Sequence, residues 1–271
     1  MIKMIVSDID GTLAPFGGSI PEYTAGVIRR CLDRGVKFIP ASGRTLVHAA
    51  EVTRDIGADC PIISCNGGRG DAHAYESLIF ENGFDRETSL YIYRTLLESG
   101  CFMTSYAGLN VYVLPERNGF GSECVKYNGA KPGRSFTVYD DIRRFETEGT
   151  VRPTKYEAYT NDIELLERLR SRFVSDGFYV SGALPFEIEI MPMGSGKGIA
   201  LKRMAEYYGV NRDEIMALGD GTNDEQMLLG AGLSVAMENG AESLKSIADV
   251  VAPHVNEYGA AKMLEKYVLE V

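Results

Sequence analysis

The sequence lacks several patterns that mark whole classes of protein. Its five cysteines are irregularly spaced without a C-x-x-C pair, and its three histidines lie far apart without the spacing of a zinc site. No lysine or arginine run is present, and no apolar run approaches membrane-spanning length. There is no internal repeat and no low-complexity tract. We therefore expect reduced thiols in a cytoplasmic protein, without zinc or a membrane span.

Positive charge is also scarce. The 28 Lys and Arg residues face 38 Asp and Glu residues, which gives a net charge of -10 at pH 7. We expect neither nucleic acid nor an anionic membrane as a partner. The N-terminus has no cationic region followed by a long apolar one, so no signal peptide is expected. Phosphate remains a candidate ligand, because a metal ion and a few local cations set the field of a site.

The order of the predicted elements indicates two domains. A chain of 271 residues with 45% hydrophobic residues exceeds one typical domain and can bury a sizeable core. Residues 1–83 read as strand, helix, strand, helix, strand, the pattern of a parallel sheet with right-handed crossovers. From 84 to 185 predicted helices alternate with strands, several of which are more amphipathic, and 118–134 is predicted to be a glycine-rich loop. We expect an α/β core of 1–83 and 186–271 with an inserted α+β domain of 84–185.

The first predicted strand ends in two aspartates. Asp8 and Asp10 follow an apolar run, and alternate residues of a strand share a face. Two carboxylates side by side repel each other unless a cation lies between them or one is protonated. The stretch predicts a hard divalent cation and acid/base chemistry. The alternative is a solvated Asp-rich turn.

Three further predicted strands also end in polar residues. The carboxyl ends of parallel strands meet at one rim of the sheet, where open α/β sheets bind their ligands. We therefore expect these groups to lie together, with Lys197 added at a helix start. The four strand ends contribute Asp8 and Asp10, Ser42 and Arg44, Asn66, and Asp220, Asn223 and Asp224.

These residue types suit phosphate chemistry. An ionised Asp8 is an oxygen nucleophile that needs no separate base, and Asp10 can give and take a proton. Asp8 with Asp220 and Asp224 forms an all-oxygen set that suits Mg²⁺ better than zinc.

Phosphate oxygens can be bound by the Ser42 hydroxyl and by backbone N–H groups beside it, including that of Gly43. Lys197 can offset the charge of a transferring phosphoryl group.

Four motifs in one order resemble the haloacid dehalogenase superfamily of phosphatases, in its Cof-type branch with a large inserted α/β cap of type C2. The resemblance covers nearly the whole chain. The motifs are Asp8-Ile-Asp10-Gly-Thr, Ala41-Ser42-Gly43-Arg44, Gly196-Lys197-Gly198 and Gly219-Asp220-Gly-Thr-Asn223-Asp224. No catalytic motif is broken, and Ser42 offers the hydroxyl that a threonine often supplies in the family.

The resemblance implies a Rossmann-like, doubly wound parallel-sheet core with an inserted cap. It implies that Asp8 becomes a phospho-aspartate and that Asp10 acts as acid and base. It also implies Mg²⁺ held by Asp8, the backbone carbonyl of Asp10 and Asp220, with Asp224 bound directly or through water. The residues it places at the phosphate or the substrate are Ser42, Gly43, Arg44, Lys197, Asn66 and Asn223.

Two of these residues have an alternative role that the sequence does not exclude. Arg44 either binds substrate or pairs with a carboxylate, and Asn66 is either functional or a turn residue. The segment 194–198 resembles a nucleotide P-loop, but Met191 and Gly198 stand where that motif needs Gly and Ser or Thr, so we reject ATP binding. In the insertion we expect tyrosines that pack and cations that could select substrate. They are Tyr106, Tyr112, Tyr127, Tyr156 and Tyr159, and Lys126, Arg152 and Lys155.

The sequence thus predicts Mg²⁺-dependent hydrolysis of a small phosphate monoester, such as a sugar phosphate or phosphoglycolate, with a cap that excludes water and selects the leaving group. Two alternatives stay open. One is a phosphomutase of sugar phosphates, and the other is a non-catalytic regulator that binds a phosphorylated metabolite. A homodimer is also left open.

Overall fold

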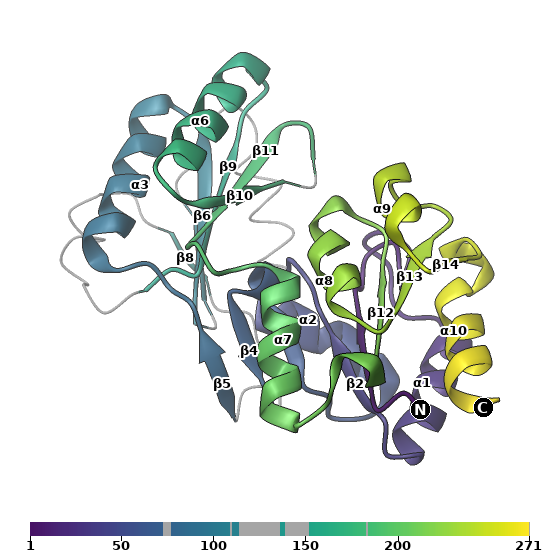
Figure 1. Cartoon of the computed structure of the whole chain (residues 1–271). Coiled ribbons are helices and arrows are strands. Elements are labelled where there is room, and N and C mark those ends of the chain that lie inside the picture. Colours follow the sequence, from purple (N-terminus) through teal and green to yellow (C-terminus); the bar gives the residue numbers. More distant parts are fainter. Residues whose placement is uncertain (73–76, 109, 114–135, 139–151, 183, 271) are drawn as a thin grey trace. The chain divides into compact units, whose positions relative to one another are not determined.

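The computed structural model of the chain describes residues 1–72, 77–108, 110–113, 136–138, 152–182 and 184–270. The chain forms two compact units (Figure 1). Unit 1 comprises Met1–Glu81 and Gly196–Val271, and unit 2 comprises Asn82–Ser195. Unit 2 is therefore an insertion into unit 1.

Unit 1 is built on a parallel sheet of five strands. The strand order is β14-β13-β12-β1-β2, and each neighbouring pair is parallel. The strands are β1 (Met4–Ser7), β2 (Lys37–Pro40), β12 (Ile215–Gly219), β13 (Leu233–Met237) and β14 (Val250–Ala252). The predicted parallel central sheet is confirmed, with the first strand in its interior.

Helices cover both faces of this sheet (Figure 1). Ile5 and Met216 point into one apolar core and Val6 and Ala217 into another, because successive strand residues face opposite ways. The first core includes residues of α1 (Glu22–Asp33), α2 (Leu46–Thr53) and α10 (Gly259–Leu264), and the second includes residues of α7 (Lys197–Tyr208), α8 (Glu225–Gly230) and α9 (Glu242–Ile247). The sheet is doubly wound, as predicted.

A smaller antiparallel sheet adjoins β2. It comprises β3 (Ile62–Ser64), β4 (Arg69–Asp71) and β5 (Leu78–Glu81) in sequential order. A single parallel bridge between Ala41 and Ile63 joins β3 to the end of β2. The sequence predicts β3 but gives no prediction of β4 and β5.

Single helical turns complete the described elements. They are Arg54–Ile56, Cys65–Gly67, Arg212–Glu214, Thr222–Asp224 and Val255–Glu257, with a π-helical turn at Glu265–Leu269. Among the residues that the structure describes, no helix is long and apolar enough to cross a membrane. The four described cysteines are buried free thiols, and Cys124 lies outside the described residues.

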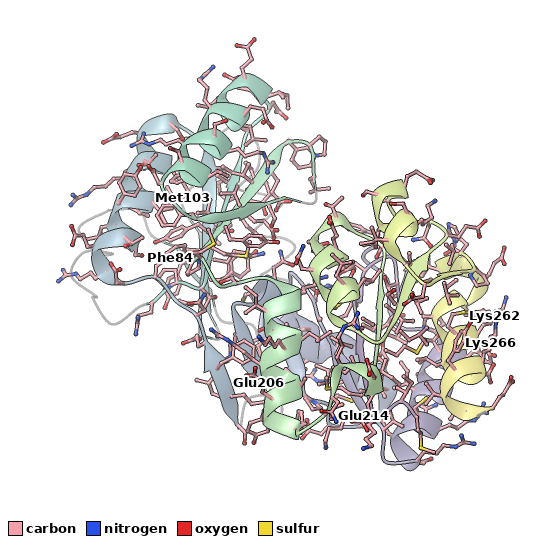
Figure 2. All side chains as sticks on the ribbon, in the orientation of Figure 1. Phe84, Met103, Glu206, Glu214, Lys262 and Lys266 are labelled. Atoms are coloured by element: carbon pink, nitrogen blue, oxygen red, sulfur yellow. The ribbon has the colours of Figure 1, made fainter. Side chains whose placement is uncertain are left out.

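Unit 2 packs two helices against one face of a six-stranded sheet. The strand order is β10-β11-β9-β6-β7-β8, antiparallel except for the parallel pair β7 and β8. Phe84 and Met103 belong to the apolar core under the helices (Figure 2). The elements are α3 (Arg86–Ser99), β6 (Phe102–Ala107), β7 (Asn110–Val113), β8 (Phe136–Val138), β9 (Lys155–Tyr159), α6 (Ile163–Ser175), β10 (Tyr179–Ser181) and β11 (Glu187–Met191).

The second boundary between the units differs from the expected one. Residues 186–195 are expected in the core, but β11 pairs with β9 and β10 in the sheet of unit 2. Ile188 and Ile190 lie in the apolar core of unit 2. The strand predicted from their alternation with Glu187 and Glu189 is therefore present, but it belongs to unit 2 and not to unit 1. The predicted loop at 118–134 lies outside the described residues.

Candidate active site

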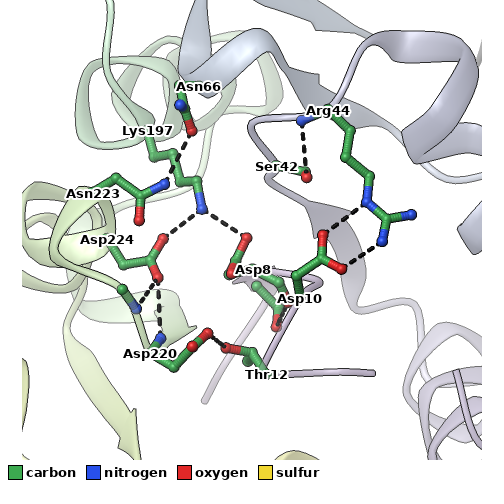
Figure 3. A network of polar contacts seen from close by, with 12 residues as sticks. Asp8, Asp10, Thr12, Ser42, Arg44, Asn66, Lys197, Asp220, Asn223 and Asp224 are labelled. Carbon is green, nitrogen blue, oxygen red and sulfur yellow. Dashed lines mark hydrogen bonds and ion pairs between the residues drawn. The ribbon is translucent and has the colours of Figure 1, made fainter. Parts of the chain in front are cut away.

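The candidate site lies where the strands of unit 1 end. Asp8 and Asp10 follow β1, Ser42 follows β2, Asn66 follows β3, and Asp220 follows β12. Figure 3 shows these groups together with the first residue of α7. The topology brings them to one rim because all the parallel strands run the same way.

A buried lysine bridges two of the carboxylates. Lys197 Nζ donates to Asp8 Oδ1 at 2.7 Å and to Asp224 Oδ1 at 2.6 Å (Figure 3). All three residues are buried. Burial alone would lower the pKa of Lys197, but the Asp224 and Asp8 carboxylates outweigh it and raise that pKa, so the lysine is charged.

Asp224 also closes the loop after β12. Its Oδ2 accepts hydrogen bonds from the backbone N–H groups of Asp220 and Gly221, both at 3.0 Å. This carboxylate therefore positions both Lys197 and the loop that carries Asp220.

Three carboxylates lie close enough to share a cation. Asp8, Asp220 and Asp224 each offer an oxygen within 4.8 Å of the others. Burial raises the pKa of the Asp8 carboxyl well above its usual range, and Asp224 and Asp220 raise it further against the opposing effect of Lys197. Burial also raises the pKa of Asp220. Two buried carboxylates, one partly buried carboxylate and one lysine leave an excess of negative charge that a divalent cation would offset.

Thr12 orients the third carboxylate. Its Oγ1 donates to Asp220 Oδ1 at 2.7 Å (Figure 3), and its side chain is buried. This role of Thr12 is not predicted from the sequence, although Thr12 belongs to the first motif. Asn239 is not predicted either, and its Nδ2 donates to the carbonyl of Gly11 at 2.8 Å. The signal for Asn239 was its position just after β13, a fifth strand end.

Asp10 is held by an arginine. Arg44 Nε donates to Asp10 Oδ2 at 2.7 Å, and a second guanidinium N–H donates to Asp10 Oδ1 (Figure 3). The backbone N–H of Gly17 also donates to Asp10 Oδ1, at 3.2 Å. Of the two roles considered for Arg44, the structure contains the pair with a carboxylate. A bidentate pair of this kind fixes the direction of the carboxylate.

The loop after β2 and the turn after β3 lie against each other. Ser42 Oγ accepts from the backbone N–H of Arg44 at 3.1 Å, and Gly43 stands between these residues. Asn66 Oδ1 accepts from Asn223 Nδ2 at 3.1 Å, which links the ends of β3 and β12. The residues predicted for catalysis, phosphate binding and metal binding thus all lie in unit 1.

A second buried polar group lies in unit 2. Lys155 Nζ donates to Glu157 at 2.6 Å and to Glu189 at 2.7 Å. Glu157 also accepts from the hydroxyls of Tyr106 and Tyr159. The Lys155 charge is therefore satisfied within unit 2, which argues against its expected role as a substrate selector.

The other tyrosines and cations that were expected to matter in the insertion differ in their burial. Tyr156 is buried in the apolar core and shares a 2.6 Å hydrogen bond with Ser89, and Tyr112 packs partly buried against that core. Arg152 is exposed. Lys126 and Tyr127 lie outside the described residues.

Proteins of known sequence match the chain along nearly its whole length. It is 28% identical over 277 residues to "Endoribonuclease YBEY, chloroplastic" from Arabidopsis thaliana, with 97% of this chain but 46% of that protein covered. The chain thus spans about half the length of that relative. It is 27% identical to "5-amino-6-(5-phospho-D-ribitylamino)uracil phosphatase YcsE" from Bacillus subtilis, with 99% of this chain and 96% of that protein covered.

Solved structures share the fold. The crystal structure of a haloacid dehalogenase-like hydrolase from Bacteroides thetaiotaomicron superposes with a TM-score of 0.85 at 24% identity, with 98% of this chain and 99% of that chain covered. The sequence model of the haloacid dehalogenase-like hydrolases matches residues 5–264. The chain therefore belongs to the family of haloacid dehalogenase-like hydrolases.

Proposed function

We propose that the chain is a Mg²⁺-dependent phosphatase that hydrolyses a small phosphate monoester through a phospho-aspartate on Asp8. The observation that carries this proposal is the cluster of Asp8, Lys197, Asp220 and Asp224 at the strand ends. It combines an oxygen nucleophile, a fixed cation and a group of acidic side chains, which is the set that phosphoryl transfer needs.

The donor set fits magnesium. The three carboxylates are hard oxygen ligands, and they come within 4.8 Å of one another. Asp8 and Asp220 would hold the ion with the backbone carbonyl of Asp10. Asp224 would act through water, because its oxygens already accept bonds from Lys197 and two backbone N–H groups. When bound, Mg²⁺ would neutralise charge on the phosphoryl oxygens.

In the first step a carboxylate oxygen of Asp8 attacks phosphorus. The new bond to Asp8 forms as the bond to the leaving oxygen breaks, and Asp10 gives that oxygen a proton. Lys197, Ser42 and the backbone N–H of Gly43 balance the charge of the phosphoryl oxygens, and Asn223 lies beside them.

In the second step Asp10 takes a proton from water. The oxygen of that water attacks phosphorus, inorganic phosphate leaves, and the Asp8 carboxylate is restored. Arg44 holds both oxygens of Asp10. A protonated Asp10 accepts from Arg44 more weakly than the carboxylate does, so the pair strengthens when Asp10 gives up its proton.

The substrate class rests on the chemistry of the site and on the relatives. One relative is named for a phosphoribitylamino substrate, and a sugar phosphate or similar small metabolite, phosphoglycolate included, fits the same chemistry. We propose that unit 1 carries the catalytic core and that unit 2 acts as the cap that selects the leaving group. An acidic chain of this kind would work in the cytoplasm on small molecules.

The test is phosphate release from a panel of phosphorylated metabolites, with Mg²⁺ and with a chelator in its place. We expect release that requires Mg²⁺ and is fastest on one compound class. Release at full rate in chelator would overturn the metal role. An isomerised sugar phosphate without free phosphate would indicate the mutase, and binding without turnover would indicate the regulator.

A further inference from the structure

The turn after β3 has an unusual backbone. Cys65 and Asn66 have φ values of 51° and 49°, and Gly67 follows with 86°. Among the described residues only three non-glycine residues have positive φ, and two of them are adjacent here. Such conformations cost on the order of 1 kcal/mol or more each and persist where surrounding contacts enforce them.

Backbone hydrogen bonds join this turn to the loop after β2. The Cys65 N–H donates to the carbonyl of Arg44 at 2.8 Å, and the Asn66 N–H donates to the carbonyl of Ser42 at 3.0 Å. Just before the turn, the Ser42 N–H donates to the carbonyl of Ile63 at 2.9 Å. Three backbone hydrogen bonds therefore join the two segments, and the Cys65 and Asn66 N–H groups that make two of them belong to the left-handed residues of the turn.

Two glycines allow a close approach on either side of Asn66. A Cβ at Gly43 would lie 3.2 Å from both Asn66 Oδ1 and Nδ2. A Cβ at Gly67 would lie 2.3 Å from the carbonyl oxygen of Gly196, immediately before Lys197. Asn66 thus packs against the loop that carries Ser42, the next residue in the turn packs against the start of α7, and Asn66 is only 2% exposed.

The Asn66 side chain makes the third connection. Its Oδ1 accepts from Asn223 Nδ2 at 3.1 Å (Figure 3). The buried carboxamide therefore contacts the segments that carry Ser42 and Asn223, and the neighbouring Gly67 backbone approaches the segment that carries Lys197. These come from distant parts of the sequence, and each is assigned to the phosphoryl group in the proposed function.

We propose that Asn66 is a positioning residue that fixes the distance between Ser42 and Asn223 without itself binding the substrate. This inference rests on the proposed function. It changes the expected role of Asn66 from a phosphate ligand to a residue that connects two loops and holds them in position. Its effect on catalysis passes through Asn223 and through the loop at Ser42. A displacement of about 1 Å in such a site can lower the rate about 100-fold.

The test compares Asn66→Gly, Asn66→Ala, Asn223→Ala and the double variant Asn66→Gly/Asn223→Ala. Glycine keeps the left-handed backbone and removes the carboxamide, whereas alanine also strains the backbone. For each variant kcat and KM are measured on the best substrate of the wild-type protein with saturating Mg²⁺, and the midpoint of thermal unfolding is recorded.

We expect kcat to fall about 10- to 100-fold in both Asn66 variants, with KM changed less than about threefold. The alanine variant should unfold at a lower temperature than the glycine variant at a similar kcat. The double variant should lose no more than the worse single variant, because Asn66 acts through Asn223.

Two results would overturn the inference. A large rise in KM, with losses that multiply in the double variant, would make Asn66 an independent phosphate ligand. An unchanged kcat in Asn66→Gly would leave it with a packing role only. If the wild-type protein itself releases no phosphate, the proposed function fails instead, so the two failures are distinguishable.

Discussion

Replacing Lys197 with methionine should destroy activity and weaken the fold, and the second buried lysine gives the matched control. Lys197 and Lys155 are each 1% exposed, and each bonds two carboxylates at 2.6 and 2.7 Å. Methionine approximates the length of the side chain without the charge. The two variants therefore remove the same physical interaction, one from the candidate site and one from unit 2.

The magnitude follows from the geometry. Two unit charges 2.7 Å apart attract by about 6 kcal/mol at an effective dielectric constant of about 20, and the desolvation of the lysine offsets part of this. Breaking a buried pair while its partners remain buried costs about 3–5 kcal/mol. Since a protein of this size has about 5–15 kcal/mol of net stability, both variants should still fold at 25 °C with a clearly lower unfolding midpoint.

The assay separates stability from catalysis. Thermal unfolding in chelator should show similar losses for Lys197→Met and Lys155→Met, and phosphate release at 25 °C with Mg²⁺ should fall about 10³-fold only for Lys197→Met. Equal activities of the two folded variants would refute the catalytic role of Lys197. A Lys197→Met protein as stable as the wild type would refute the energetic argument.

Two further predictions concern packing and pH. Gly67→Ala should destabilise the protein by about 2–5 kcal/mol, because a left-handed alanine is strained and its Cβ would overlap the Gly196 carbonyl. Gly209→Ala is the control in thermal unfolding, since it has φ +65 with open space around it and should cost only about 1–2 kcal/mol; equal losses would contradict the overlap. Burial and the neighbouring Glu157 and Glu189 raise the pKa of Glu187 to about 8, so its contribution to stability is lost as pH rises from about 4.5 to 8. Glu187→Gln should flatten the pH dependence of the unfolding midpoint in that window, and an unchanged slope would disprove this.

The site residues that could be predicted from the sequence are those that directly follow a predicted strand. Asp8, Asp10 and Asp220 follow short apolar runs that indicate buried strands, and parallel topology brings such strand ends together. The helix that begins at Lys197 and ends before Gly209 is likewise predicted from the sequence, and the structure contains it at Lys197–Tyr208. These features depend on local pattern.

The partners of those residues could not be predicted, because they depend on long-range packing. Arg44 meets Asp10 across 34 positions, and Asn223 meets Asn66 across 157. The sequence assigns β11 to the wrong unit for the same reason. Alternating Glu187-Ile188-Glu189-Ile190 fits either sheet equally well, and the buried Glu189 accepts hydrogen bonds from Lys155, 34 positions away, and from Ser181 in the neighbouring strand.

The most direct test of the account is phosphate release by Asp8→Asn. Asparagine keeps the shape of the side chain and removes the nucleophilic charge that Lys197 contacts. With Mg²⁺ and the best substrate of the wild-type protein, we predict a fall of about 10³-fold or more in kcat while the protein stays folded. A folded Asp8→Asn protein that retains a tenth or more of wild-type activity would contradict the phospho-aspartate mechanism.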